Sequence, residues 1–411
     1  MHMADALVSP ALGGTMWAAS AGLAAWCGHT LREARDDSRV PLMGVLGAFV
    51  FAGQMINFSI PGTGSSGHLG GGLILAILLG PQAALLVLAS VLTVQALFFA
   101  DGGLLALGCN IINLGFFPAF VAYPLVYRPL VGSSYAGGRA WAAAVVAAVV
   151  GLQLGALGVV LETSFSEISD LPLGTFLLLM QPIHLAIGVV EGLATAAVVA
   201  FVARARPETL GVTPAASESR AGLRSVLVGL GLAAVLLGGV VSWFASSAPD
   251  GLEWSIARSS GRDEVAVAPG PIHTVLAGVQ EKTALLPDYG FKAAAAAPDA
   301  TDFLAAPSAA DGQVGRGRPY PTPVASLAGD RQSPHAATPN GTVNSLAAAP
   351  APSAAEPGAA TAAWPAVSAS TSLSGLLGGL LVLALAALLG VALRPRRAPA
   401  PSVRPRGAVG L

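Results

Sequence analysis

Long uncharged stretches follow one another along this chain, separated by short polar segments. A helix needs about 20 predominantly apolar residues to cross the hydrocarbon core of a bilayer. Uncharged stretches cover residues 8–27, 41–58, 69–100, 102–127, 140–161, 225–248 and 373–393. A further run at 171–203 is apolar except for His184 and Glu191. The pattern therefore predicts an all-α polytopic membrane protein.

The 69–100 stretch is too long for one simple helix. Gly80-Pro81 interrupts it, and proline disfavours the helical conformation of the residue before it. We therefore predict a short helix at 69–79 and a full one at 82–100, which gives nine hydrophobic segments in total.

Arginines indicate the orientation of these segments, because cytoplasmic loops carry an excess of Lys and Arg. They lie between or after the segments, at Arg32, Arg35, Arg39, Arg128, Arg139, Arg204, Arg206, Arg220, Arg224, Arg394, Arg396, Arg397, Arg404 and Arg406. The loop with Glu162 and Asp170 contains no basic residue, and neither does 59–68. Nine segments in the plasma (inner) membrane, with the amino end outside, place every basic loop inside the cell.

Composition divides the chain into a transmembrane domain at 1–204, a cytoplasmic linker at 205–224 and a second domain at 225–411. We expect the second domain to contain a transmembrane helix at 225–248, an external region at 249–372, a transmembrane helix at 373–393 and a basic cytoplasmic tail at 394–411. Residues 293–370 are mostly Ala, Pro, Ser and Gly, which bury too little apolar surface to offset the entropy of ordering. We predict a disordered linker there, whereas 249–292 has the mixed composition of a segment that folds.

Composition also excludes several classes of function. The chain is 54% hydrophobic and 10% charged, against about 25% charged residues in soluble domains. Its formal net charge of -1 argues against a nucleic acid partner, because phosphates require a basic surface. Neither lysine, Lys282 or Lys292, lies in a P-loop motif, so we expect ATP hydrolysis to occur in other subunits.

His2 is a candidate metal ligand because of its place directly after Met1. The Met1 amine, the His2 amide and the His2 imidazole can bind one ion and close a five-membered and a six-membered chelate ring. Such a nearly planar nitrogen set suits Ni(II) and Cu(II). This requires Met1 to remain, and the first residues lack the basic stretch of a cleavable signal peptide. The alternative is a solvated terminal residue.

A second histidine, His68, lies in the glycine-rich stretch "IPGTGSSGHLGGG". The predicted orientation places this loop on the same side as the amino end. Glycine permits close backbone approach and positive φ angles. Irregular backbone at membrane depth is tolerated where it is buried in protein or lines a cavity. We therefore favour a shared site with His2 over a flexible surface loop.

His184 and Glu191 are seven residues apart, so they share one face of a helix. Ionisable residues within a membrane span are costly and often functional. Three interpretations are open: a second ion site, a mutually satisfied structural pair, or a contact with a partner subunit. Gln54 and Asn57 also share a helical face. Hydrogen bonding between helices is enough to explain these two polar residues.

The first half of the chain resembles the CbiM/NikM family, the metal-capture membrane components of energy-coupling factor transporters for cobalt and nickel. The stretches that carry the resemblance are "MHMADALVSP", "LMGVLGAFVFAGQMINFSIPGTGSSGHLGGGLILAILLGP" and "DGGLLALGCNIINLGF". The resemblance implies about seven helices and a metal held by Met1, His2 and His68. Asp5, Asn57, His184 and Glu191 are expected in the surroundings of the site or in partner contacts. After Met-His the family often has Ile-x-Asp/Glu-Gly, whereas this chain has Met3-Ala4-Asp5-Ala6.

The second half resembles the small companion subunit of those systems, through "APDGLEW" and "LLPDYGF". The opening motif and the glycine-rich loop of the first half resemble the cobalamin-linked branch of the family. This implies import of Co²⁺ for cobalamin biosynthesis, with Ni²⁺ as the alternative cargo and no permanently bound cofactor. It also implies partners: a transmembrane coupling subunit and cytosolic ATPases. Two rivals are an acid–base enzyme that uses His184 and Glu191, and a membrane anchor for an external interaction domain.

Overall fold

A computed structural model describes residues 1–34, 40–132, 135, 137–205, 223–262, 270–292 and 364–393. The basic tail lies outside the described residues, and so do most of the predicted linker and of the Ala/Pro tract. The expectations for these three segments therefore remain predictions.

Helices dominate the described residues, as the hydrophobic pattern predicts. In the first half they are α1 (Pro10–Ala34), α2 (Val40–Gln54), α3 (Gly72–Leu79), α4 (Pro81–Val94), α5 (Leu107–Ile111), α6 (Arg128–Val131), α7 (Gly138–Ser166) and α8 (Leu173–Ala205). A 3-10 turn at Asp5–Leu7 precedes α1. Wider π-helical turns at Gln95–Phe99 and Ile112–Tyr127 continue α4 and α5.

The second half adds α9 (Leu223–Gly239), α10 (Gly251–Ser260), α11 (Pro271–Thr283) and α12 (Ala369–Ala392), with 3-10 turns at Val241–Phe244 and Pro287–Tyr289. The expectation that 249–292 folds is met, because α10 and α11 lie there. The predicted 225–248 segment is helical only to Gly239, with the 3-10 turn after it.

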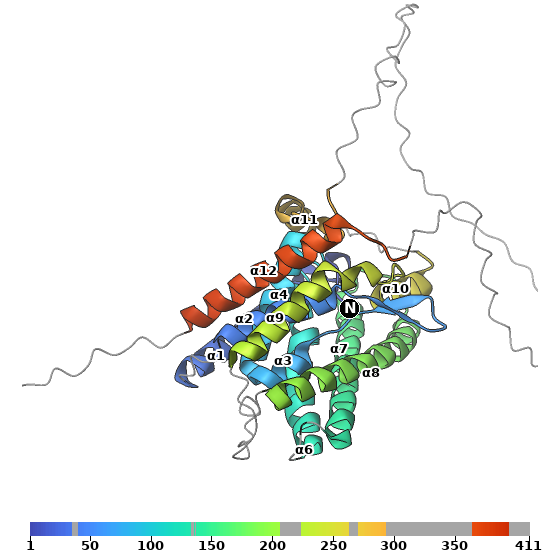
Figure 1. The fold of residues 1–411 in the computed structure, drawn as a ribbon. Helices are drawn as coiled ribbons and strands as arrows, with labels where there is room; N and C mark the ends of the chain where they lie inside the picture. The colour runs from blue at the N-terminus through green and yellow to red at the C-terminus, as the bar shows by residue number, and fades with distance from the viewer. Residues whose placement is uncertain are drawn as a thin grey trace, which may run out of the picture. The chain divides into compact units, whose positions relative to one another are not determined.

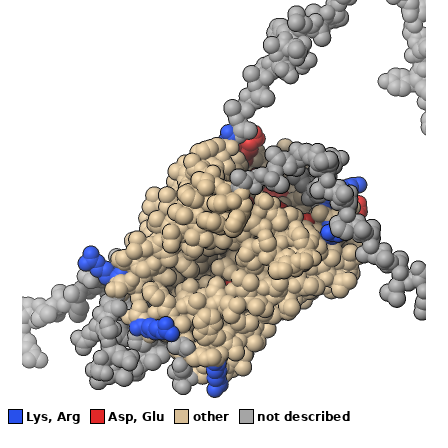
Figure 2. Space-filling view, turned by 45° about the vertical axis from the view of Figure 1, so that its right-hand side comes forward, with Lys and Arg blue, Asp and Glu red and all other residues tan. Residues whose placement is uncertain are grey.

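Five helical segments among the described residues are long and apolar enough to cross a membrane: Pro81–Phe99, Leu107–Val131, Gly138–Ser166, Leu173–Ala205 and Ala369–Ala392. Two further apolar helices, α2 and α9, are shorter. The structure therefore confirms an all-α polytopic membrane protein. Figure 2 shows one face with a broad uncharged surface and charged side chains gathered towards its ends, which fits a surface embedded in lipid.

The predicted break at Gly80-Pro81 is present. Gly80 has φ 84 and ψ 160, a conformation outside the helical region, and Pro81 begins α4. Proline suits the first helical position because its missing N–H would have no partner there. The break separates the short α3 from α4, as the sequence predicts.

The glycine-rich loop is a β-hairpin. β1 (Phe58–Ile60) pairs antiparallel with β2 (Ser65–Gly67), and all three residues of β2 are buried. Gly62 and Gly64 have φ of 79° and 78° in the turn, which glycine adopts without strain. The hairpin holds His68 at a fixed depth beside the helices.

Helices of the second half pack against the first half. Figure 1 shows α9 and α12 beside α2, and the amino end of the chain close to α10. Small residues permit close approach between α9 and α12: a Cβ added to Gly375 would overlap the carbonyl of Gly238. Close packing of small residues is a typical driving force of helix association in membranes.

Gly375→Ala is expected to destabilise the protein. The added Cβ overlaps backbone of Gly238, and such overpacking costs about 1–3 kcal/mol. The matched control is Gly379→Ala on the same helix, where the nearest atom lies 3.8 Å away and a helical Ala is favoured over Gly. Thermal melting in detergent measures both variants, and an unchanged midpoint for Gly375→Ala would contradict the packing.

Candidate metal-binding site

The first residues of the chain lie inside the protein rather than in solvent. Met1 is 5% exposed and Met3 is fully buried. Asn110 fixes Met3 from α5: its Oδ1 accepts from Met3 N at 2.8 Å, and its Nδ2 donates to Met3 O at 3.2 Å. Gly103 N donates to the same carbonyl at 2.9 Å. These backbone contacts hold the amino end in place.

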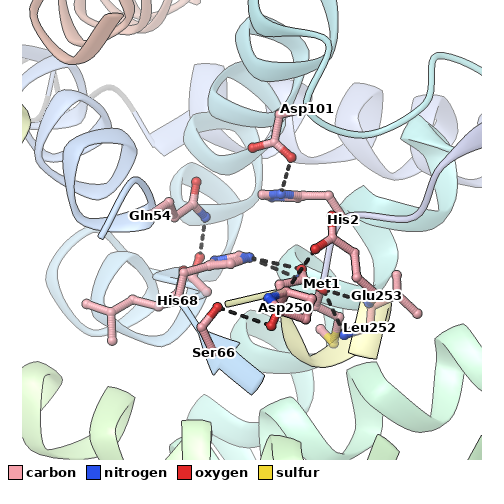
Figure 3. Close-up of polar contacts among 12 residues, drawn as sticks. Met1, His2, Gln54, Ser66, His68, Asp101, Asp250, Leu252 and Glu253 are labelled. Atoms are coloured by element: carbon pink, nitrogen blue, oxygen red, sulfur yellow. Dashed lines mark hydrogen bonds and ion pairs between the residues drawn. The ribbon is translucent and has the colours of Figure 1, made fainter. Parts of the chain in front are cut away.

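Met1, His2 and His68 lie together, as the sequence predicts (Figure 3). The Met1 amine donates to His68 Nε2 at 3.0 Å. The rings of His2 and His68 stack with centroids 5.0 Å apart and an interplanar angle of 19°. Three nitrogen-bearing groups therefore share one small volume, although Met1 and His68 are 67 residues apart in the chain.

Two carboxylates that the sequence analysis did not assign complete this cluster. Asp250 Oδ2 lies 2.8 Å from the Met1 amine and 4.0 Å from His68 Nε2. Asp101 Oδ1 lies 2.8 Å from His2 Nδ1, and Tyr289 donates to Asp101 Oδ2 at 2.5 Å. Asp101, Asp250 and Tyr289 each lie in a stretch that carries the family resemblance: "DGGLLALG", "APDGLEW" and "LLPDYGF". These motifs are the sequence signal that could have pointed to the three residues.

Electrostatics favour a neutral His68 and ionised carboxylates. Burial lowers the pKa of the His68 imidazole to about 3, and the nearby N-terminal ammonium adds to this effect. Burial alone would raise the pKa of Asp250, but the ammonium holds it below its usual value. Burial alone would likewise raise the pKa of Asp101, but the contact with His2 holds this pKa below its usual value. The His68 Nδ1 donates to Leu69 O at 3.1 Å, so its Nε2 carries the lone pair.

Asp101 orients the His2 ring. Its Nδ1, the nitrogen that would close a six-membered chelate ring, faces Asp101 at 2.8 Å. Its Nε2 is buried and has no hydrogen-bond partner among the described residues. In this part of the chain no three His, Cys, Asp or Glu side chains converge on a metal position. A metal bound here would therefore need the amine or a backbone nitrogen among its ligands, and His2 Nδ1 could bind it only after leaving Asp101.

Glu191 holds the loop that carries His68. Its two oxygens accept from Gly70 N at 2.7 Å and Gly71 N at 3.1 Å. Gln54 donates to Gly70 O at 2.8 Å. Glu191 therefore positions the loop. The interpretation of His184 and Glu191 as a mutually satisfied pair is wrong, because each bonds to backbone instead.

The other candidate residues lie around the site without contacting Met1 directly. Asp5 accepts from Leu105 N and Ala106 N at 2.8 and 3.0 Å, which anchors the segment before α5. The Asn57 backbone carbonyl accepts from Ser246 N at 2.7 Å. His184 donates through Nδ1 to Met180 O at 2.8 Å.

A larger cavity adjoins His2. Its volume is about 750 Å³, and four carboxylates line it: Asp101, Asp250, Glu253 and Asp288. Three of these come from the second half of the chain. An acidic cavity beside a buried amine and two imidazoles attracts cations toward these groups.

Two family models match this chain. One, described as the cobalt uptake substrate-specific transmembrane region, matches residues 2–209 of the 411. The other, described as the PDGLE domain, matches residues 224–395. The first match includes His2, His68 and Asp101, and the second includes Asp250 and Tyr289.

Individual relatives and a solved structure are similar to about half of this chain. A putative metal transport protein of Haloquadratum walsbyi is 37% identical over 213 residues, which are 51% of this chain and 92% of that protein. A putative fused nickel transport protein of Archaeoglobus fulgidus is 37% identical over 210 residues, 51% of this chain and 68% of that protein. A crystal structure of a truncated transition metal transporter is 31% identical, with a TM-score of 0.43, and covers 49% of this chain and 98% of that one.

Glu191→Gln is expected to weaken metal binding about tenfold, because outer groups that orient a ligand typically contribute 10–100-fold to affinity. The amide retains one acceptor for the loop but loses the other. Glu162→Gln is the control, since Glu162 is also buried and bonds to Asn113 rather than to the loop. Titration of the purified protein with Co²⁺ and Ni²⁺ measures both, and equal effects would contradict the positioning role.

Proposed function

This chain belongs to the family of cobalt uptake substrate-specific transmembrane regions and carries a PDGLE domain, and from this premise we propose that it captures Co²⁺ outside the cell for import. In this proposal it is the specificity component of an energy-coupling factor importer in the plasma membrane. The imported cobalt supplies cobalamin biosynthesis.

The observation that carries the proposal is the contact between the Met1 amine and His68 Nε2 at 3.0 Å, with the His2 ring stacked beside them. The amine, the His2 amide and the His2 Nδ1 supply three nitrogens, and His68 Nε2 supplies the fourth. Binding must release the protons of the amine and of the amide, because metal ligands must be deprotonated. His68 needs no such release, since its buried imidazole is already neutral.

The acidic cavity supports entry of a cation from the side on which the amine lies. Asp101 and Asp250 line the cavity and also contact the ligand residues. In the proposal this side faces outward, which agrees with the arginine-rich loops predicted inside. Transport then needs partners: a transmembrane coupling subunit and cytosolic ATPases, because this chain contains no P-loop motif.

Ni²⁺ is the second candidate cargo. A planar set of four nitrogens favours Ni(II), and the Archaeoglobus fulgidus relative is described as a nickel transport protein. The enzyme alternative has less support, because His184 and Glu191 bond to separate backbone groups and do not form an acid–base pair.

Insertion of one alanine between Met1 and His2 is expected to abolish high-affinity metal binding. The ring that joins the amine to the amide of the next residue stays five-membered. The imidazole moves one residue farther along the chain, so it no longer closes a six-membered ring with that amide beside His68. Isothermal titration with Co²⁺ measures binding, and thermal melting checks that the variant is folded. A folded insertion variant with wild-type affinity would rule out the terminal chelate.

His68→Ala is expected to remove the fourth nitrogen and to lower Co²⁺ affinity by about 100-fold, which corresponds to about 2.7 kcal/mol. His29→Ala is the control, because the His29 side chain is 72% exposed on α1 and lies outside the site. Uptake of radioactive Co²⁺ into cells that also contain the partner subunits gives the transport readout. Uptake by His68→Ala equal to that by His29→Ala would exclude His68 as a ligand.

A further inference from the structure

A second, smaller cavity borders Met1, and Asp250 lines both this cavity and the acidic one. Its volume is about 10 Å³, which is close to the space that one water molecule requires. Met1 and His68 line it on one side, and His184 and Asp250 also border it. The remaining side-chain walls are apolar and include Leu114, Leu152 and Ile187.

His184 brings an unused acceptor to this cavity. The side chain is fully buried in α8. Its Nδ1 faces the Met180 carbonyl at 2.8 Å, and because a carbonyl only accepts, Nδ1 carries the proton. Nε2 therefore has a lone pair, and it has no hydrogen-bond partner among the described residues. A buried acceptor of this kind is normally satisfied by protein or by an ordered water.

Glycines let two segments that line the cavity pack closely against α8. A Cβ on Gly251 would lie 2.5 Å from Ile183 Cγ2 and 3.4 Å from His184 Cε1. A Cβ on Gly67 would overlap Ile187. The backbone that carries Asp250 and the backbone that precedes His68 therefore both lie against the same part of α8.

Asp250 is the second polar partner available to a water. Its Oδ1 accepts from Leu252 N and Glu253 N at 2.8 Å each, while its Oδ2 contacts the Met1 amine. A carboxylate offers about four lone-pair sites, so Oδ2 can accept a hydrogen bond from a water beside its contact with the amine.

We propose that a water in this cavity is a fifth ligand of the bound metal, held by His184 Nε2 and Asp250, and that it favours Co²⁺ over Ni²⁺. The water donates one O–H to His184 and the other to Asp250, and its lone pair faces the metal. The inference rests on the proposed function, because it assumes that Met1, His2 and His68 bind the ion.

The preference follows from the electronic structure of the two ions. Low-spin Ni(II) is satisfied by four planar nitrogens and gains little from an axial ligand, whereas Co(II) commonly takes a fifth or sixth ligand. Among the described residues no three His, Cys, Asp or Glu side chains are placed to hold a metal ion. In this proposal His184 therefore acts through the water, as a positioning residue.

The test compares Co²⁺ and Ni²⁺ affinities of the purified full-length chain, wild type and His184→Leu, by competition with a chelator. X-ray absorption of each metal-loaded form reports the coordination number. We expect His184→Leu to weaken Co²⁺ binding about tenfold, in the range seen when a group that hydrogen-bonds to a metal ligand is removed. We expect Ni²⁺ affinity to stay within about threefold, and the Co²⁺ spectrum to lose one oxygen ligand.

Two further variants separate this role from a structural one. His184→Gln retains an acceptor and is expected to restore most of the Co²⁺ affinity. Thr195→Val on the same helix also removes a buried side-chain oxygen without a hydrogen-bond partner among the described residues, but Thr195 does not border the cavity. Thr195→Val is expected to leave the affinities for Co²⁺ and Ni²⁺ unchanged. If His184→Leu does not fold, His184→Asn, whose amide is too short to span the cavity, replaces it with the same expected result.

The inference is overturned if Co²⁺ affinity and coordination are unchanged in His184→Leu, or if both metals weaken equally. His2→Ala in the same assay distinguishes the two levels of the proposal. If His2→Ala loses binding of both metals while His184→Leu has no effect, the proposed function is supported and only the fifth ligand is excluded. A wild-type chain that binds neither metal overturns both.

Discussion

The buried charge of the N-terminal amine is the constraint on which the rest of the site depends. Met1 is almost completely buried, and a buried ammonium is stable only when it is paired and hydrogen-bonded. Asp250 supplies the opposite charge and His68 the second acceptor. Three other features keep this pairing in place: the hairpin that positions His68, the contacts of Asn110 with Met3, and the start of α10.

Asp250 meets this requirement because its two oxygens have separate tasks. Oδ1 accepts the first backbone N–H groups of α10, in a capping box with Glu253. Oδ2 remains free for the amine. The sequence Pro-Asp-Gly-Leu-Glu thus forms a helix start and a counter-ion together. The parallel bridge between Ser66 and Asp250 sets the distance from this helix to the hairpin.

The sequence predicts the local features of this fold well, because they depend on neighbouring residues. The break at Gly80-Pro81 follows from backbone preferences, and the apolar helices follow from composition. The closeness of Met1, His2 and His68 follows from coordination chemistry and family resemblance. The roles of Asp101, Asp250 and Tyr289 were missed, because Asp250 meets Met1 across 249 residues and no periodicity encodes such a contact. The pairing of His184 with Glu191 was one of three interpretations, and it failed because helical spacing shows a shared face but not a shared partner.

The joining of both halves in one polypeptide has a consequence for how the site is completed. A separate subunit would supply Asp250 only as often as its cellular concentration and affinity allowed. Covalent linkage makes the same docking an intramolecular event, so it does not depend on the concentration of a second chain. Each amine is therefore matched with one carboxylate from its own chain, and this ratio does not vary with the level of gene expression.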